Sequence, residues 1–347
     1  MLILLWARPA PAPFPSTDER MASSDEDWEI PDELQPDPAE WSFPLDRALG
    51  AVVGLKSLVP EDAFTARSLG TERQGNGVLI RADGLVLTIG YLVAEAESVW
   101  LTAAGGRVVP GHALAFDHES GFGLVQVLGR LEGIAALELG DADRVRPGER
   151  ALLAAAGGRA RTVACVIAAR QPFAGYWEYA LDDAFYTAPA HPSWGGAALI
   201  GEDGRLLGIG SLILQRRDQK GRKLDLNMVV PVSGLRPILD DLLAYGRVNR
   251  PARPWLGLYA TEDEEGVVAV SVAPGGPSER AGVRQGDRLV AVGEARIEDL
   301  GGLWRAVWSC GVAGARVPLA VMRDGRRREL VIESSDRRRF LKAPRLH

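Results

Sequence analysis

A pair of glycines between two apolar runs, within residues 187–210, constrains the fold of this chain most strongly. The run reads TAPAHPSWGGAALIGEDGRLLGIG, and the pair is Gly195 and Gly196. The sequence Glu202-Asp203-Gly204 has the composition of a tight turn between two strands. The segment therefore predicts a β-hairpin in a domain that is built from strands.

The length and composition of the chain indicate a globular protein with several domains. Its 347 residues are enough for two or three domains, and 46% of them are hydrophobic. The 40 glycines and 22 prolines favour an all-β architecture with many turns. The net charge is −6, so the chain lacks the excess of basic residues that would indicate binding to nucleic acid.

The cysteines and histidines give no sign of a disulfide framework or a metal centre. Cys165 and Cys310 fall in different predicted domains, so neither a disulfide framework nor a cysteine-based metal site is expected. The four histidines have no ligand spacing; they are His112, His118, His191 and His347. We therefore expect no metal and no cofactor.

The first residues do not have the pattern of a signal peptide. Only six apolar residues open the chain, which is too short for a signal core or a membrane span. This favours a cytoplasmic location, and it leaves open whether the chain starts at Met1 or Met21.

Residues 22–46 contain nine acidic residues and no Lys or Arg. Such a segment buries too little apolar surface to offset the entropy of ordering, so residues 1–46 are predicted to be disordered. One interpretation is a solvated acidic tail. The other is a docking segment, with Trp28 and Trp41 as anchors in a partner or in the protein's own groove.

Two further segments support a resemblance to a known family. GNGVLIRADGLVLTIGYLV starts at Gly75 and has Asp83-Gly84 at a hairpin turn, and DHESGFGLVQV starts at Asp117. Together with residues 187–210, they resemble the HtrA (Deg) family of serine proteases. Near the other end, VAPGGPSERAGVRQGDRLVAV starts at Val272 and resembles the PDZ domain of the same family almost position for position.

The resemblance implies a fold dominated by β-strands, in which a trypsin-like double β-barrel precedes a C-terminal PDZ domain. Residues 232–245 are amphipathic at helical spacing and end at Gly246, and residues 297–310 have a similar apolar face. The expected parts are a disordered acidic, proline-rich segment, the double barrel, the PDZ domain and a basic tail. Their boundaries are 1–46, 47–246 (barrels about 47–133 and 147–233), 254–336 and 337–347.

The resemblance places the catalytic triad at residues that cannot fill its roles. The general base, the acid and the nucleophile fall at Tyr91, Gly121 and Trp194. A phenol, with a pKa of about 10, cannot accept a serine proton at neutral pH as imidazole does. Pro192 also lacks the N–H that the family uses to stabilise the oxyanion. These substitutions predict a non-catalytic pseudoprotease, acting as an adaptor or in protein quality control.

Two alternatives remain open. If the alignment slips by one residue, Ser193 becomes the nucleophile of a divergent serine endopeptidase. His191 lies two residues earlier, and extended geometry points both side chains to one side of a strand. In the other alternative, an apolar groove lined by Tyr91 and Trp194 holds unfolded segments, as a chaperone does.

The resemblance also implies that the PDZ domain binds the C-termini of proteins or peptides. Such domains add an extended peptide to a sheet edge and hold its terminal carboxylate with main-chain N–H groups. The implied carboxylate loop is Trp255, Leu256, Gly257 and Leu258, and the implied side-chain pocket is Leu303, Trp304 and Val307. The alternative for the three helix residues is a place in the core. Relatives commonly form trimers and are exported to the periplasm, although the acidic start of this chain does not resemble a usual trimer element.

Overall fold

The computed structural model describes residues 29–217, 221 and 223–342, which form two compact units. The barrel unit contains the described residues from 29 to 171 and from 183 to 249. The C-terminal unit contains residues 172–182 and 250–342. Residues 172–182 were expected to belong to the double barrel, but they cluster with the C-terminal unit.

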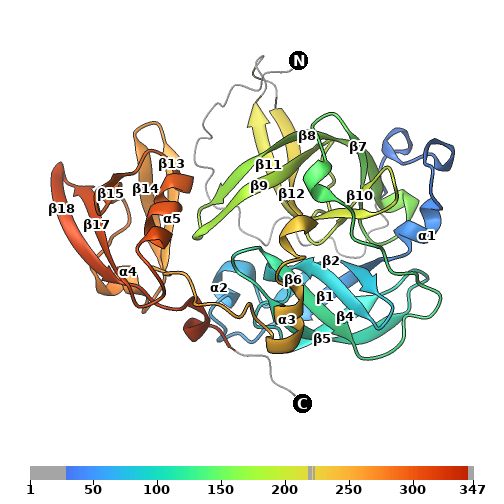
Figure 1. The fold of residues 1–347 in the computed structure, drawn as a ribbon, viewed down its shortest axis with the longest axis horizontal. Coiled ribbons are helices and arrows are strands. Elements are labelled where there is room, and N and C mark those ends of the chain that lie inside the picture. Colours follow the sequence, from blue (N-terminus) through green and yellow to red (C-terminus); the bar gives the residue numbers. More distant parts are fainter. Residues whose placement is uncertain (1–28, 218–220, 222, 343–347) are drawn as a thin grey trace. The chain divides into compact units, whose positions relative to one another are not determined.

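The first barrel is closed by six antiparallel strands in the order β1-β2-β3-β6-β5-β4 (Figure 1). In β1, buried and exposed residues alternate along most of the strand, as expected where one face of a sheet packs on a core. The expected hairpin at Asp83-Gly84 joins β2 to β3, and Gly84 has a φ of +91°. The strands are β1 (Val52–Leu58), β2 (Glu72–Arg81), β3 (Leu85–Ile89), β4 (Ser98–Thr102), β5 (Val108–Phe116) and β6 (Phe122–Val127).

The second barrel repeats this design with the strand order β10-β11-β12-β9-β8-β7. The hairpin predicted at Glu202-Asp203-Gly204 is present and joins β10 to β11. The strands are β7 (Arg150–Ala154), β8 (Thr162–Gly175), β9 (Tyr179–Ala188), β10 (Ala198–Gly201), β11 (Leu206–Arg217) and β12 (Lys223–Pro231).

Short helices connect the strands of the barrel unit. The α-helices are α1 (Leu45–Leu49), α2 (Ala66–Leu69) and α3 (Leu239–Tyr245). The 3-10 helices are η2 (Asp32–Leu34), η3 (Pro38–Glu40), η4 (Gly90–Leu92), η5 (Ala142–Arg144), η6 (Arg159–Arg161) and η7 (Val232–Gly234).

The acidic segment is ordered over residues 29–46, which corrects the expectation of disorder there. Trp41 is buried; its ring packs edge-on against Phe43, and the Arg150 guanidinium lies 5.0 Å from the ring centroid. The main-chain N–H of Ile30 donates to the carbonyl of Ala160. Burial of these two apolar side chains on the barrel offsets the ordering entropy, which composition alone does not reveal. Trp28 and the rest of residues 1–28 lie outside the described residues.

The helix expected over residues 232–245 is interrupted. A 3-10 turn, η7, is followed by turns, and α3 begins only at Leu239. Pro237 explains the break, because a proline disfavours helical geometry in the residue before it. The end of the helix is as predicted: Gly246 has a φ of +65°, and its N–H donates to the Leu242 carbonyl.

The described part of the C-terminal unit contains a six-stranded sheet, two α-helices and a 3-10 helix. Asp299 caps α5, because its side chain accepts a hydrogen bond from the N–H of Gly302. The strands are β13 (Leu258–Asp263), β14 (Gly266–Val272), β15 (Arg288–Val292), β16 (Ala295–Arg296), β17 (Arg316–Arg323) and β18 (Arg326–Glu333). The helices are α4 (Pro277–Arg280), α5 (Leu300–Ser309) and the 3-10 helix η8 (Arg337–Phe340).

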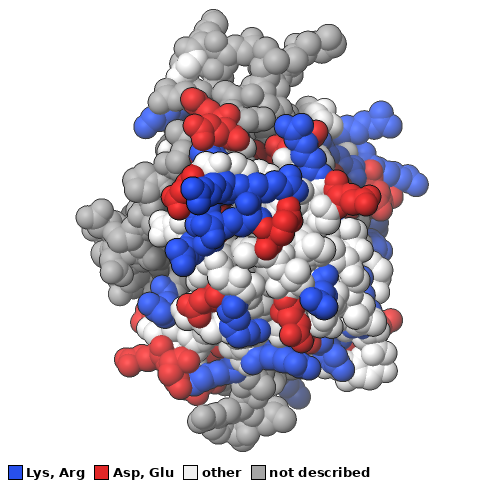
Figure 2. Space-filling model, turned by 90° about the vertical axis from the view of Figure 1, so that its left-hand side faces the viewer, with Lys and Arg blue, Asp and Glu red and all other residues white. Residues whose placement is uncertain are grey.

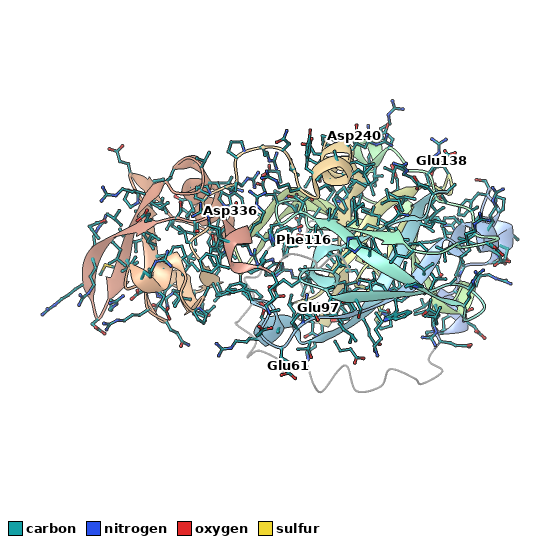
Figure 3. All side chains as sticks on the ribbon, turned by 90° about the horizontal axis from the view of Figure 1, so that it is seen from below. Glu61, Glu97, Phe116, Glu138, Asp240 and Asp336 are labelled. Carbon is teal, nitrogen blue, oxygen red and sulfur yellow. The ribbon has the colours of Figure 1, made fainter. Side chains whose placement is uncertain are left out.

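The basic tail, expected to be frayed, is ordered as far as residue 342. Asp336 caps η8 through a hydrogen bond from the N–H of Arg338, and Figure 3 labels this aspartate. Phe340 packs against Trp255, with ring centroids 4.6 Å apart. Residues 343–347 lie outside the described residues.

Charges of both signs are mixed on the surface, and the described helices are short. On the face shown in Figure 2, Lys and Arg side chains are interspersed with Asp and Glu side chains. None of the helices in the described ranges combines the length and apolar character needed to cross a membrane.

Candidate functional site

The structure brings the predicted base and acid positions together at one end of the first barrel. Tyr91 lies in η4, directly after β3, and Gly121 precedes β6. The N–H of Gly90, the neighbour of Tyr91, donates to the Gly121 carbonyl at 2.7 Å. Gly121 has a φ of +85°, which only glycine adopts without strain. Main-chain contacts therefore replace a side-chain pair at these positions.

The phenol of Tyr91 meets the loop that carries Trp194. Its hydroxyl donates to the Ser211 carbonyl at 2.9 Å and lies close to the backbone of Gly195. Burial raises the pKa of Tyr91, and a hydrogen bond from the Trp194 side chain opposes that shift. The phenol is therefore neutral at physiological pH and serves as a hydrogen-bonding group. The three predicted triad positions lie together, with Tyr91 in the middle.

Asn76 on β2 holds the loop that contains Ser193. Its side-chain amide donates to Ser193 Oγ and to the carbonyls of Ser193 and Gly195, at 3.1–3.2 Å. Its Oδ1 accepts from the N–H of Ala156 at 2.9 Å. Asn76 is only 3% exposed, so each of these bonds is shielded from water. This single side chain fixes the position of the Ser193 hydroxyl.

His191 is buried and has a defined tautomer. Its Nε2 lies 2.9 Å from the Arg161 carbonyl, and its Nδ1 accepts from the N–H of Ser193 at 2.9 Å. Since a carbonyl only accepts and an N–H only donates, the ring proton must lie on Nε2. Burial lowers the pKa of His191 to about 4, so the imidazole is neutral at pH 7. Asn227 bonds to both the N–H and the carbonyl of His191.

The glycine pair allows the close packing of this loop. A Cβ on Gly196 would lie 1.8 Å from the Asn76 carbonyl oxygen, and Gly196 has a φ of +75°. A Cβ on Gly210 would lie 2.2 Å from the Trp194 carbonyl oxygen. Both positions therefore need glycine because main chains meet there. The other histidine considered above, His118, packs edge-on against Phe116, which Figure 3 labels on the first barrel.

The predicted carboxylate loop of the C-terminal unit binds a carboxylate of its own chain. The N–H groups of Leu256 and Leu258 donate to the side chain of Glu178, at 2.8–3.2 Å. Gly257 between them has a φ of +67°. Trp255 is buried, and its N–H and carbonyl bond to Ser335. The loop thus has the geometry of a carboxylate site.

The three predicted pocket residues are fully buried in the core of the C-terminal unit. Leu303, Trp304 and Val307 lie on one face of α5 and have 0% exposure. The indole N–H of Trp304 donates to the Gly175 carbonyl at 2.9 Å. Trp304 therefore contacts the segment 172–182, which belongs to the same unit. That these residues form a side-chain pocket for a peptide stays a prediction.

Three polar residues of these sites were missed from the sequence. Asn76 could have been noticed, because it is a polar residue between two glycines at the start of the segment that resembles the HtrA family. Asn227 and Glu178 carry no local signal, since their partners lie 36 and 78 or more residues away.

Family models match both parts of the chain. The trypsin-like peptidase domain matches residues 75–209, and the PDZ domain matches residues 254–333. Both matches agree with the two architectures seen in the structure.

Curated relatives of the chain are serine proteases by name. A probable periplasmic serine endoprotease, DegP-like, from Chlamydia trachomatis is 24% identical over 75% of this chain and 53% of its own length. The putative serine protease HhoA from Synechocystis is 27% identical, over 76% of this chain and 71% of its own length. Serine protease PepD from Mycobacterium tuberculosis is also 27% identical, over 76% and 61%. The chain spans about half of the length of the chlamydial relative.

Solved structures agree on the fold. The HtrA-type protease AlgW, solved with a decapeptide, aligns over 87% of this chain and 98% of its own, with a TM-score of 0.52 and 20% identity. The serine endoprotease from Yersinia pestis aligns over 85% and 98%, with a TM-score of 0.50 and 19% identity.

These comparisons correct the expectation of a non-catalytic pseudoprotease. The relatives are named as serine proteases or endoproteases, and nothing in the comparisons indicates a loss of catalysis. They favour the alternative, a serine-type endopeptidase. The roles assigned to Tyr91, Gly121, Trp194 and Ser193 stay predictions, because the comparisons do not test single residues.

Proposed function

Because this chain is a member of the HtrA/Deg family, we propose that it is a serine-type endopeptidase that cleaves polypeptides, with Ser193 as its nucleophile. Support for the activity comes from the serine proteases among its relatives. The observation that carries the choice of residue is the hydrogen bond from Ser193 N–H to His191 Nδ1. It puts an unprotonated imidazole nitrogen beside the only residue of the segment 192–196 that bears a hydroxyl.

In the proposed reaction, Ser193 Oγ forms a bond to the scissile carbonyl carbon, and its proton moves to Nδ1 of His191. The proton then passes to the leaving amine as the C–N bond breaks. Water hydrolyses the resulting acyl-enzyme and restores the hydroxyl. The first step requires the hydroxyl to take the acceptor that the Ser193 N–H occupies in this structure.

The proposed enzyme is expected to be slow. Burial lowers the pKa of His191 to about 4, so its imidazole is a weaker base than one with a pKa near 7. Tyr91 and Gly121 supply neither a second base nor a carboxylate. Loss of triad members in a serine protease lowers kcat by roughly 10⁴- to 10⁶-fold. We expect turnover in that reduced range.

Labelling with a fluorophosphonate tests this function directly, because such probes react only with an activated serine. The full chain is incubated with the probe for hours, and peptide mapping locates the label. We expect labelling at Ser193, its loss in Ser193→Ala, and its retention in Ser68→Ala, which removes an exposed hydroxyl of the same unit. The same three proteins are then compared in digestion of a reduced, alkylated protein.

Absence of labelling and digestion in the wild-type chain contradicts the proposal. Equal labelling in Ser193→Ala contradicts the choice of nucleophile. Labelling that maps to Ser193 and disappears in its variant supports both.

The PDZ domain supports peptide binding, and we propose that its ligands are the C-termini of proteins or peptides. Support comes from the main-chain N–H groups of Leu256 and Leu258, which converge on one carboxylate. Strand β13 also stands at the edge of its sheet, where an extended peptide can pair.

A further inference from the structure

A turn of the same chain lies against β13 and α5 of the C-terminal unit, the two elements that would flank a bound peptide. The turn joins β8 to β9 and lies within residues 172–182, which cluster with this unit. The N–H of Ala260 on β13 donates to the Tyr176 carbonyl at 2.9 Å. The Trp304 indole on α5 donates to the Gly175 carbonyl at 2.9 Å. The turn is therefore hydrogen-bonded to both the strand β13 and the helix α5.

The end of this turn places a carboxylate where a peptide terminus would bind. Both oxygens of Glu178 accept hydrogen bonds, from the N–H of Leu256 and from the N–H of Leu258. The side chain is buried, at 8% exposure. A buried carboxylate with several N–H donors is the arrangement that holds the terminus of a bound peptide.

The backbone conformation of Glu178 is unusual for a residue with a long side chain. Its φ is +58°, in the left-handed region where glycine or asparagine is favoured. A residue with a long side chain persists in such a conformation when its surroundings hold it there. The hydrogen bonds of the carboxylate supply that restraint.

The neighbours of Glu178 fix the turn further. Ala174 and Ala180 pack against the core of the C-terminal unit. The ring of Trp177 stacks on Tyr179, with centroids 5.6 Å apart, and the Trp177 carbonyl accepts from Arg337 at 3.5 Å. The turn is thus held by apolar packing as well as by its polar contacts.

We propose that the β8–β9 turn is an internal ligand of the PDZ groove, in which the Glu178 carboxylate occupies the place of a peptide C-terminus. A peptide must then displace the turn before it binds. The competing peptide has the same chemistry: an extended end with a free carboxylate. The inference rests on the proposed peptide binding of the PDZ domain and is independent of cleavage at Ser193.

The occupied groove lowers the apparent affinity for peptides. If the open form is about a tenth of the population, the apparent Kd is about tenfold above the intrinsic value. Removing the Glu178 carboxylate shifts the population to the open form. Glu178→Gly gives the clearest test. It removes the carboxylate, and because glycine adopts the left-handed conformation without strain, it keeps the turn. Glu178→Ala removes the carboxyl group altogether.

Hydrogen–deuterium exchange on the full chain tests whether the groove is occupied. In the wild type we expect slow exchange at the amides of Leu256, Leu258 and Ala260. In Glu178→Ala and Glu178→Gly we expect exchange at least about tenfold faster, because the open form dominates. Asp182→Asn is the control: it removes an exposed carboxylate from the same hairpin and should exchange as the wild type does.

Peptide binding completes the test. The probe is a dye-labelled decapeptide pool with an apolar last residue and a free carboxylate, and its amidated counterpart is the negative probe. Tighter binding of the free-carboxylate pool to both Glu178 variants than to Asp182→Asn supports the proposal. Unchanged exchange at the three amides in both Glu178 variants overturns it, whatever the peptides do. Labelling at Ser193 is measured separately, so failure of one proposal does not imply failure of the other.

Discussion

The imidazole Nδ1 of His191 accepts a hydrogen bond from the main-chain N–H of Ser193 at 2.9 Å. The other ring nitrogen faces the Arg161 carbonyl, so both nitrogens of the buried ring have partners. The two hydrogen bonds stabilise the loop. Within the described part of the chain, His191 is also the only imidazole near the hydroxyl of Ser193. Structural and catalytic roles of His191 can be separated by experiment.

Replacing His191 with glutamine tests its role as the base. Glutamine can donate to the Arg161 carbonyl and accept from Ser193, so it preserves both hydrogen bonds but cannot take up a proton. We expect labelling at Ser193 to fall at least about 100-fold, the size of a general-base contribution, with unfolding free energy changed by about 1 kcal/mol or less. Unchanged labelling in a folded His191→Gln protein excludes His191 as the base.

The stability of the chain should depend on pH through His191. Burial lowers the pKa of His191 from 6.5 to about 4, so the unfolded chain binds the proton more tightly between these values. Stability is therefore full above pH 6.5 and decreases as the pH falls toward 4, by up to about 3 kcal/mol. Urea unfolding of wild type and His191→Gln from pH 7 to 4 measures this. The difference in unfolding free energy between the wild type and His191→Gln should shrink or reverse as the pH falls. A difference that stays constant with pH contradicts the prediction.

Truncation of Asn76 should destabilise the barrel unit. Asn76→Ala leaves the Ser193 carbonyl and the Ala156 N–H without their side-chain partner in a buried site. The expected cost is about 2–4 kcal/mol. Gln74→Ala, at an exposed position on the same strand, should cost about 0.5 kcal/mol or less. Equal midpoints for the two variants in urea unfolding would show that Asn76 contributes little.

Gly196 should not tolerate a side chain, because the main chain of Asn76 fills the space. Gly196→Ala places a Cβ 1.8 Å from the Asn76 carbonyl oxygen, whereas Gly105→Ala meets nothing within 4 Å. Both glycines have positive φ, so the second variant measures backbone strain alone. We expect a loss of about 1 kcal/mol for Gly105→Ala and above about 4 kcal/mol for Gly196→Ala. Thermal unfolding of both proteins tests the difference, and similar melting temperatures would refute it.

The internal ligand should close more tightly at acidic pH. Burial raises the pKa of Glu178 from 4.5 to about 7, against the opposing effects of the loop N–H groups and the charge of Arg337. Burial also raises the pKa values of Tyr176 and Tyr259, so these phenols stay neutral in this range. The closed form therefore binds a proton more tightly than the open form between pH 4.5 and 7. Closure is strongest below pH 4.5 and weakens as the pH rises through 7.

Peptide binding reads out this dependence. We measure the Kd of the free-carboxylate decapeptide pool for the wild type and for Glu178→Ala from pH 5 to 8. The variant reports the pH dependence of the peptide itself. The ratio of the wild-type to the variant Kd should fall by about fivefold or more as the pH rises. A ratio that stays constant, or rises with pH, contradicts the prediction.

Much of the fold could be predicted because its signals are local. The Asp83-Gly84 turn specifies a hairpin from two adjacent residues, and Gly246 ends a helix through its own backbone conformation. The order at residues 29–46 could not be predicted in this way. Their composition indicates a solvated tail. In the structure, however, Trp41 packs against Arg150, which lies more than 100 positions away in the chain.

The two architectures, the turns between their strands, and the residue types at the positions of Tyr91, Gly121 and Trp194 could be read from the chain alone, because these depend on residue identity and local spacing. The roles of the buried polar groups become visible only in the folded chain. Asn76 reaches Ser193 across 117 positions, and Glu178 reaches the carboxylate loop across 78. Such contacts leave no periodic signal in the chain, since they depend on how separate strands and loops meet once the cores have formed.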